Sequence, residues 1–116
     1  MLKSKIHRAT LTGAELDYEG SIAIDEDLMK AADILAGEQV HVLNMANGAR
    51  LITYVIQAPA GSGTMMLNGP AARLGASGDE VIVLSYSEME EEDARLHKPR
   101  VVFVDQENRA CTKPEK

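Results

Sequence analysis

The sequence predicts a single small domain that folds as a mostly-β barrel. Its 116 residues match the size of one domain, and the 45% hydrophobic and 26% charged residues are the balance of an ordinary globular chain. Short apolar segments rich in β-branched residues alternate with glycine and proline, and one segment has clear helical spacing. The segment Ala49–Gln57 carries large side chains on both faces, which favours a closed barrel or a subunit interface over an open sheet.

The first half of the chain is predicted to contain four strands and one helix. The strands are expected over residues 3–10, 22–24, 39–45 and 49–57. The last two form a hairpin, because Asn47-Gly48 suits a tight two-residue turn. Asp25 is a good helix N-cap, the apolar residues after it have helical spacing, and Gly37 ends the run. We therefore expect a helix from Glu26 to Leu35.

The second half is predicted to contain three more strands, over residues 64–67, 80–86 and 100–104, with one helical turn at 69–74. The acidic run Glu88–Asp93 is expected to be a solvated loop or the start of a helix. Residues 105–116 are polar and contain Pro114, so we expect a flexible tail after the last strand.

Composition disfavours several classes of function. The net charge of −6, with 3% aromatic residues and no Trp, argues against a nucleic-acid partner. The longest aliphatic run, Val81–Leu84, is far shorter than the roughly 20 residues of a membrane span, and the N-terminus shows no apolar signal segment. The single cysteine, Cys111, cannot form an internal disulfide. We therefore expect a cytoplasmic protein without a membrane partner.

Common cofactor motifs are not found. The three histidines, His7, His41 and His97, lack the i, i+4 spacing and the cysteine partners of a zinc site, so no metal is expected. The glycines do not form a phosphate loop or a dinucleotide-binding pattern.

Five short motifs occur in one order along the chain. They are Ser4–Ala9, Tyr18–Ser21, Asn47–Arg50, Thr53–Tyr54 and Asn68–Ala72. In this order and spacing the chain, from about Lys3 to Val104, resembles the aspartate 1-decarboxylase family of pyruvoyl-dependent enzymes. The resemblance implies a double-psi β-barrel with one or two short helices. It also implies a cytoplasmic homotetramer with its active sites between subunits.

The resemblance implies that the chain cuts itself between Gly20 and Ser21. The Ser21 hydroxyl attacks the Gly20 carbonyl, which the glycine leaves unshielded, and the amide becomes an ester. Elimination and hydrolysis then leave a covalent pyruvoyl group, with no metal and no pyridoxal phosphate. The products are a β chain of residues 1–20 and an α chain of residues 21–116. Thr53 is expected to assist cleavage by a hydrogen bond to the Gly20 carbonyl.

The substrate that the resemblance implies is L-aspartate, whose amine forms a Schiff base with the pyruvoyl group. Loss of CO₂ leaves a carbanion, to which Tyr54 donates a proton, and β-alanine is released for pantothenate and coenzyme A synthesis. Arg50 is the natural bidentate partner for a substrate carboxylate, and Lys5 is the second cation. Thr53 and the Gly69-Pro70-Ala71 segment are expected to contact the substrate.

Other positions near these motifs carry less specific expectations. Asn68 and Tyr18 are expected to be neighbours of the site, whereas His7 fits a structural role. Pro70 departs from the alanine that many family members carry, and since proline has no N–H, backbone donors there are limited to Gly69 and Ala71.

The spacing on one strand indicates an assembled site. Arg50 and Tyr54 share one face, roughly 13 Å apart at ~3.3 Å per residue, and Thr53 lies on the other face. One straight strand cannot aim all three at a small substrate, so a bend or a second subunit is needed. Two alternatives to the decarboxylase remain open: a non-catalytic double-psi β-barrel binding module, and a family member trapped uncleaved.

Overall fold

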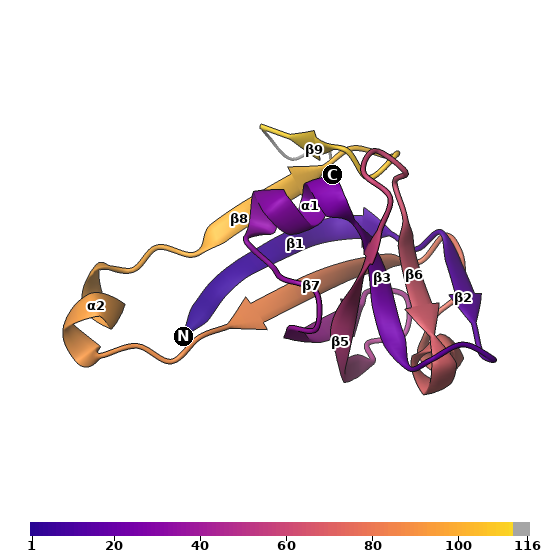
Figure 1. Ribbon diagram of the computed structural model, residues 1–116, viewed down its shortest axis with the longest axis horizontal. Coiled ribbons are helices and arrows are strands. Elements are labelled where there is room, and N and C mark those ends of the chain that lie inside the picture. The colour runs from indigo at the N-terminus through magenta and orange to yellow at the C-terminus, as the bar shows by residue number, and fades with distance from the viewer. Residues whose placement is uncertain (113–116) are drawn as a thin grey trace.

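A computed structural model describes residues 1–112 of the chain. In it the chain forms one nine-stranded sheet (Figure 1). The strands are β1 (Leu2–Thr10), β2 (Gly13–Glu15), β3 (Ser21–Asp25), β4 (Gln39–Asn44), β5 (Arg50–Ala58), β6 (Met65–Asn68), β7 (Glu80–Tyr86), β8 (Arg100–Val104) and β9 (Ala110–Cys111). The helices are α1 (Glu26–Ala32), α2 (Glu91–Leu96) and the 3-10 helix η1 (Gly69–Leu74). Strand β2, three residues long, is an addition to the predicted elements.

The strand order closes the sheet on itself. It runs β2-β6-β3-β5-β4-β7-β1-β8-β9, with β3–β5, β1–β8 and β2–β6 parallel. Strands β1 and β2 follow each other in the chain but lie near opposite ends of this order. The residues between them join both sides, since Leu11 N–H donates to Asp79 O at 2.8 Å and Thr12 N–H to Met65 O at 2.8 Å. The predicted fold class, a small double-psi β-barrel with short helices, is confirmed.

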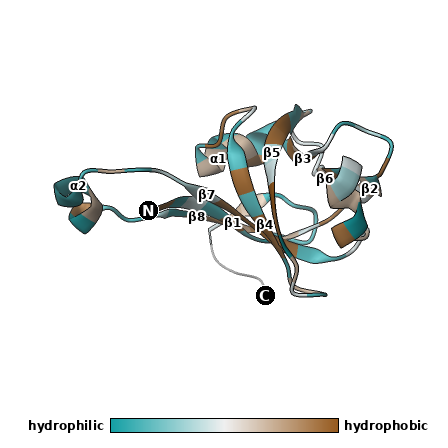
Figure 2. Cartoon of the chain, turned by 90° about the horizontal axis from the view of Figure 1, so that it is seen from below, coloured by the Kyte–Doolittle hydropathy of each residue, from teal (hydrophilic) through white to brown (hydrophobic). Residues whose placement is uncertain are grey.

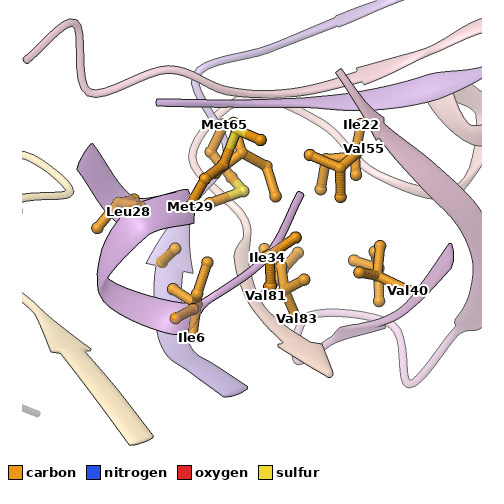
Figure 3. Close-up of a cluster of buried hydrophobic side chains, with 14 of the residues drawn as sticks. Ile6, Ile22, Leu28, Met29, Ile34, Val40, Val55, Met65, Val81 and Val83 are labelled. Atoms are coloured by element: carbon orange, nitrogen blue, oxygen red, sulfur yellow. The ribbon is translucent and has the colours of Figure 1, made fainter. Parts of the chain in front are cut away.

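The barrel interior is filled by aliphatic side chains from every long strand (Figure 3). The larger strand side chains that are 0% exposed are Ile6, Ile22, Ile24, Val40, Val42, Val55, Met65, Leu67, Val81 and Val83. Helix α1 packs Leu28 and Met29 onto this core. Buried and more exposed positions alternate along β4, as the period of a β-strand predicts, whereas all five residues of β3 are buried.

Helix α1 begins where the sequence predicts but ends earlier. Asp25 caps it by accepting the Asp27 N–H at 2.8 Å. The expected end at Leu35 is wrong, because Asp33 adopts the left-handed conformation, at φ 56°, that stops a helix. Ile34 N–H then bonds Met29 O at 2.8 Å, which turns the Ile34 side chain into the core and leaves Leu35 71% exposed.

In the stretch after Asp105, where the sequence predicts a flexible tail, the chain makes a hydrogen-bonded turn and then strand β9. The Asp105 carboxylate accepts the N–H groups of Glu107 at 2.8 Å and Arg109 at 2.9 Å. Asn108 is 2% exposed, and its amide donates to Thr10 O at 2.7 Å and to Gly63 O at 2.9 Å. These polar side chains bond the backbone rather than water, which composition alone does not reveal. Residues 113–116, with Pro114, lie outside the described residues.

Strands β7 and β8 continue out of the barrel into an arm that ends in α2 (Figure 1). The acidic run forms the first turn of α2, in agreement with the predicted helix start, and α2 buries none of its residues. The tip of the arm is mostly hydrophilic (Figure 2), although Leu96 is 84% exposed. None of the helices in the described chain is long and apolar enough to cross a bilayer.

Strand β5 is covered on one face only within a single chain. Leu51 and Val55 point into the barrel, whereas Ile52 on the outer face is 57% exposed. Pairing brings Ile52 beside His41, and His41 beside Leu84, so this outer face continues across β4 and β7. The large side chains on both faces of β5 therefore serve the barrel core on one side and an open apolar surface on the other.

Candidate active site

A pocket of about 420 Å³ lies at the edge of strand β5. Its lining residues come from the end of the β2–β3 loop, from β5 and from η1: Gly20, Leu51, Ile52, Thr53, Tyr54, Pro70, Ala71 and Leu74. Strand β3 begins to pair with β5 only at Ile22 and Val55. Gly20 and η1 therefore flank the preceding part of β5, where a neighbouring strand would otherwise lie.

Ser21, the first residue of β3, is buried at this edge. It is 0% exposed and pairs with Asn68 of β6. Its hydroxyl donates to the Glu19 carbonyl at 2.9 Å and accepts from the Asn68 side-chain amide at 3.2 Å. The contact with the Glu19 carbonyl turns the Ser21 hydroxyl back toward the residues that precede it in the chain. The hydroxyl therefore lies beside the Gly20–Ser21 peptide.

Gly69 packs its backbone directly against Gly20. Its φ of +65° is in the left-handed region, and a Cβ at this position would lie 2.7 Å from Gly20 Cα and 2.8 Å from Gly20 N. A Cβ on Gly20 itself would lie 3.4 Å from Pro70 Cδ. The start of η1 is thus brought against the Gly20 backbone by a contact that only glycine allows.

Thr53 and Tyr54 both line the pocket, although they belong to opposite faces of β5. Both reach it because it opens at the edge of the strand. Extending the parallel register of Ile22 and Val55 by two residues brings Thr53 beside Gly20. Partial burial raises the pKa of the Tyr54 hydroxyl, and the nearby charge of Glu19 and a hydrogen bond with that carboxylate raise it further.

The two predicted substrate cations lie away from this pocket in a single chain. Arg50 is exposed, and its Nη1 lies 3.1 Å from His41 Nδ1. Lys5 is on β1, which is separated from β5 by β7 and β4 in the sheet. Lys5 and His41 both pair with Leu84, so Lys5 belongs to the same outer face as His41. Neither cation lines the pocket, although Ile52 and Tyr54, which do, share the outer face of β5 with Arg50.

The three weaker candidates have different surroundings. Asn68 is 2% exposed and bonds Ser21, whereas Tyr18 is 57% exposed and lines a second pocket with Asn68. His7 packs edge-on against Phe103, with ring centroids 5.8 Å apart. Burial lowers the pKa of His7, and the charges of Lys5 and Arg8 lower it further.

Glu19 is a neighbour of the site that sequence reasoning missed. Its carbonyl accepts the Ser21 hydroxyl and its carboxylate meets Tyr54. Its place immediately before the Gly20-Ser21 pair is the signal that could have found it.

The barrel thus buries Ser21, which follows a glycine, beside a pocket lined by a tyrosine, and its relatives are enzymes of one family. The family model for "Aspartate decarboxylase" matches residues 1–111. A protein from Dehalococcoides mccartyi named aspartate 1-decarboxylase is 62% identical over 109 residues, covering 94% of this chain and 88% of the relative. Aspartate 1-decarboxylase 1 of Gloeobacter violaceus is 62% identical over 113 residues, covering 96% of each chain. Aspartate 1-decarboxylase of Maricaulis maris is 54% identical over 115 residues, covering 99% of this chain and 95% of the relative.

The chain therefore belongs to the aspartate decarboxylase family.

Proposed function

We propose that this chain converts L-aspartate to β-alanine and CO₂, using a pyruvoyl group made from Ser21 after self-cleavage of the Gly20–Ser21 bond. The observation that carries the proposal is the buried Ser21 hydroxyl, bonded to Glu19 O and Asn68 Nδ2 at the edge of a pocket with Tyr54. Membership of the aspartate decarboxylase family supports the reaction class. The β-alanine product supplies pantothenate and coenzyme A synthesis.

Cleavage starts with attack of Ser21 Oγ on the Gly20 carbonyl carbon, which turns the amide into an ester and frees the Ser21 nitrogen. Elimination breaks the Cβ–Oγ bond, so Gly20 leaves as a carboxylate and dehydroalanine remains. Hydrolysis of this group releases ammonia and leaves the pyruvoyl group at the head of residues 21–116. Thr53, beside Gly20 in the strand register, is the donor that we assign to the carbonyl oxygen.

The surroundings of position 21 fit the group that the family uses. When formed, the pyruvoyl group supplies an electrophilic carbonyl for the aspartate amine and an acceptor for the electrons that CO₂ leaves behind. Asn68 is the side chain assigned to hold it, since its amide lies at hydrogen-bond distance from Ser21 Oγ and is therefore next to the atoms of residue 21 that remain after Oγ leaves with Gly20.

The other pocket residues have roles that follow from their chemistry. Tyr54 holds a proton on its hydroxyl at neutral pH, because the ordinary pKa of tyrosine is about 10, and we assign it as the donor to the former α-carbon. Thr53 and the segment Gly69–Ala71 are assigned to substrate contact. In that segment only Gly69 and Ala71 have a backbone N–H to offer.

We assign Arg50 and Lys5 to the two carboxylates of aspartate. Because both lie outside the pocket of their own chain, the proposal requires a second copy to complete the site. A cytoplasmic homotetramer with sites between subunits meets this requirement. The exposed apolar outer face around Ile52 supports such an assembly.

Intact-mass spectrometry of the purified protein tests the proposal directly. Two fragments divided between Gly20 and Ser21 are expected, the larger with a blocked N-terminus that reacts with carbonyl reagents. The preparation should also form β-alanine from aspartate. A single full-length chain that persists after prolonged warming, without β-alanine formation, would instead favour a binding module or a trapped precursor.

A further inference from the structure

Arg50 is held by a histidine. Its Nη1 lies 3.1 Å from His41 Nδ1 on the outer face of the barrel, and it makes no ion pair within residues 1–112. A guanidinium has only donors, so in this hydrogen bond His41 Nδ1 is the acceptor, which is the role of the tautomer that carries its proton on Nε2.

The His41 ring is itself fixed between neighbouring strands. It sits edge-on to the Tyr86 ring of β7, with centroids 5.0 Å apart at 67°. Its backbone neighbours are Ile52 on β5 and Leu84 on β7, which set its place in the middle of three strands. The imidazole is therefore a rigid acceptor from which Arg50 can be oriented.

The neutrality of this acceptor matters for the role of Arg50. A carboxylate partner would neutralise the guanidinium and occupy its fork of donors, in competition with a substrate carboxylate. A neutral imidazole takes one N–H and leaves the positive charge and the other donors available. It orients the arginine and keeps it ready for an acidic ligand.

We propose that His41 is a positioning residue that holds Arg50 in the orientation in which its guanidinium meets a carboxylate of aspartate. The inference rests on the proposed function, in which Arg50 binds substrate. It extends that function to a residue outside the five motifs.

Two substitutions of His41 distinguish the role of its acceptor nitrogen from the role of its aromatic ring. His41→Phe keeps a ring beside Tyr86 but removes the acceptor, whereas His41→Asn keeps an amide oxygen near the position of Nδ1 and loses the ring. Each variant is first checked for cleavage by intact mass, and KM and kcat for aspartate are then measured. We expect His41→Phe to raise KM roughly 3- to 10-fold, as for loss of one hydrogen bond, with kcat changed less than about twofold. His41→Asn should restore most of the affinity.

A double-mutant cycle with Arg50→Ala shows whether the effect passes through Arg50. In the Arg50→Ala background, His41→Phe should add no further increase in KM. The matched control is His97→Phe, since His97 follows α2 and its ring bonds Leu2 O at 2.8 Å rather than Arg50. This control should keep the KM of the unchanged protein.

An unchanged KM in His41→Phe, or an equal increase with and without Arg50, would overturn the inference. If His41→Phe does not fold, His41→Gln, which moves the acceptor toward the Nε2 position, carries the same expectation of a raised KM. Absence of β-alanine formation by the unchanged protein is a different outcome, because it rejects the proposed function itself.

Discussion

In the proposed function, Ser21 reacts with its own backbone rather than with an external substrate. Its hydroxyl bonds a carbonyl and an amide, and no histidine or carboxylate in the described chain bonds it as a base. A serine that attacks an external substrate depends on such a base. The Gly20 carbonyl is in the residue next to Ser21, so the Ser21 hydroxyl does not have to meet it by diffusion. This proximity replaces part of the activation that a base would give the hydroxyl.

Cleavage and turnover should separate at Ser21 and Tyr54. Ser21→Ala removes the attacking oxygen, so we expect a full-length chain and no activity. Tyr54→Phe removes only the proton donor, so we expect normal fragments and turnover reduced by about 10²- to 10⁴-fold, the usual worth of a general acid. Intact mass and β-alanine formation measure the two effects. Full turnover in Tyr54→Phe would assign the proton donor elsewhere.

At the scale of elements, the start of η1 is packed against the scissile peptide. Gly69→Ala would place a methyl group against the Gly20 backbone and would also strain a residue at φ +65°. We expect cleavage to slow markedly, because the added methyl group displaces the Gly20 carbonyl. Intact-mass spectrometry over time measures the cleavage rate.

Gly61→Ala is the matched control for this substitution. Gly61 has a similar φ of +76°, but a Cβ there would meet no atom within 4 Å. This variant carries the backbone strain, about 1–2 kcal/mol, without the contact to Gly20. Equal cleavage rates in the two variants would mean that the close approach of Gly69 is not needed for processing.

Glu38 ties the loop before β4 to strands β1 and β7. Its carboxylate accepts from the Ser85 hydroxyl, from Leu35 N–H at 3.1 Å and from Lys3 Nζ at 3.1 Å. Burial alone would raise the pKa of Glu38, but the hydrogen bonds from Ser85, Leu35 and Lys3 outweigh it, so the pKa lies below the ordinary 4.5.

This lowered pKa predicts a loss of stability in acid. The ionised carboxylate stabilises the folded state above the ordinary pKa of 4.5, and this contribution is lost as the pH falls through the lower folded-state pKa. Glu38→Gln should lose about 1–2 kcal/mol at pH 7 and show a weaker acid dependence below about pH 4.5. Denaturant unfolding across this pH range measures both. An unchanged acid dependence in the variant would contradict the assignment.

For the whole molecule, the open outer face and the distant cations predict an oligomer. Light scattering should give a mass several times that of one chain, and a tetramer is expected. Ile52→Glu puts a charge into the exposed apolar face and should reduce both the mass and the activity. Leu35→Glu is the matched control, since Leu35 is 71% exposed, follows the end of α1 and is not one of the residues of that face. An active monomer would exclude a site shared between subunits.

Local patterns were enough to predict most of the elements. The Asn47-Gly48 turn, the Asp25 cap and the β-branched runs each depend on near neighbours in the chain, so they can be read without tertiary contacts. The end of α1 and the ordered turn at Asn108 could not be read this way. Each depends on contacts between segments far apart in the chain, such as the bonds from Asn108 to Thr10 and Gly63.

The sequence by itself determined the barrel class, the family and the set of residues proposed to act, because motif order and residue chemistry are properties of the chain. Only the tertiary structure decided which of these residues meet. It brings Gly20, Thr53, Tyr54 and η1 to one strand edge and leaves Arg50 beside His41 on the outer face. The reason is physical: strand pairing and barrel closure set distances across the sheet, and no spacing along the chain encodes them.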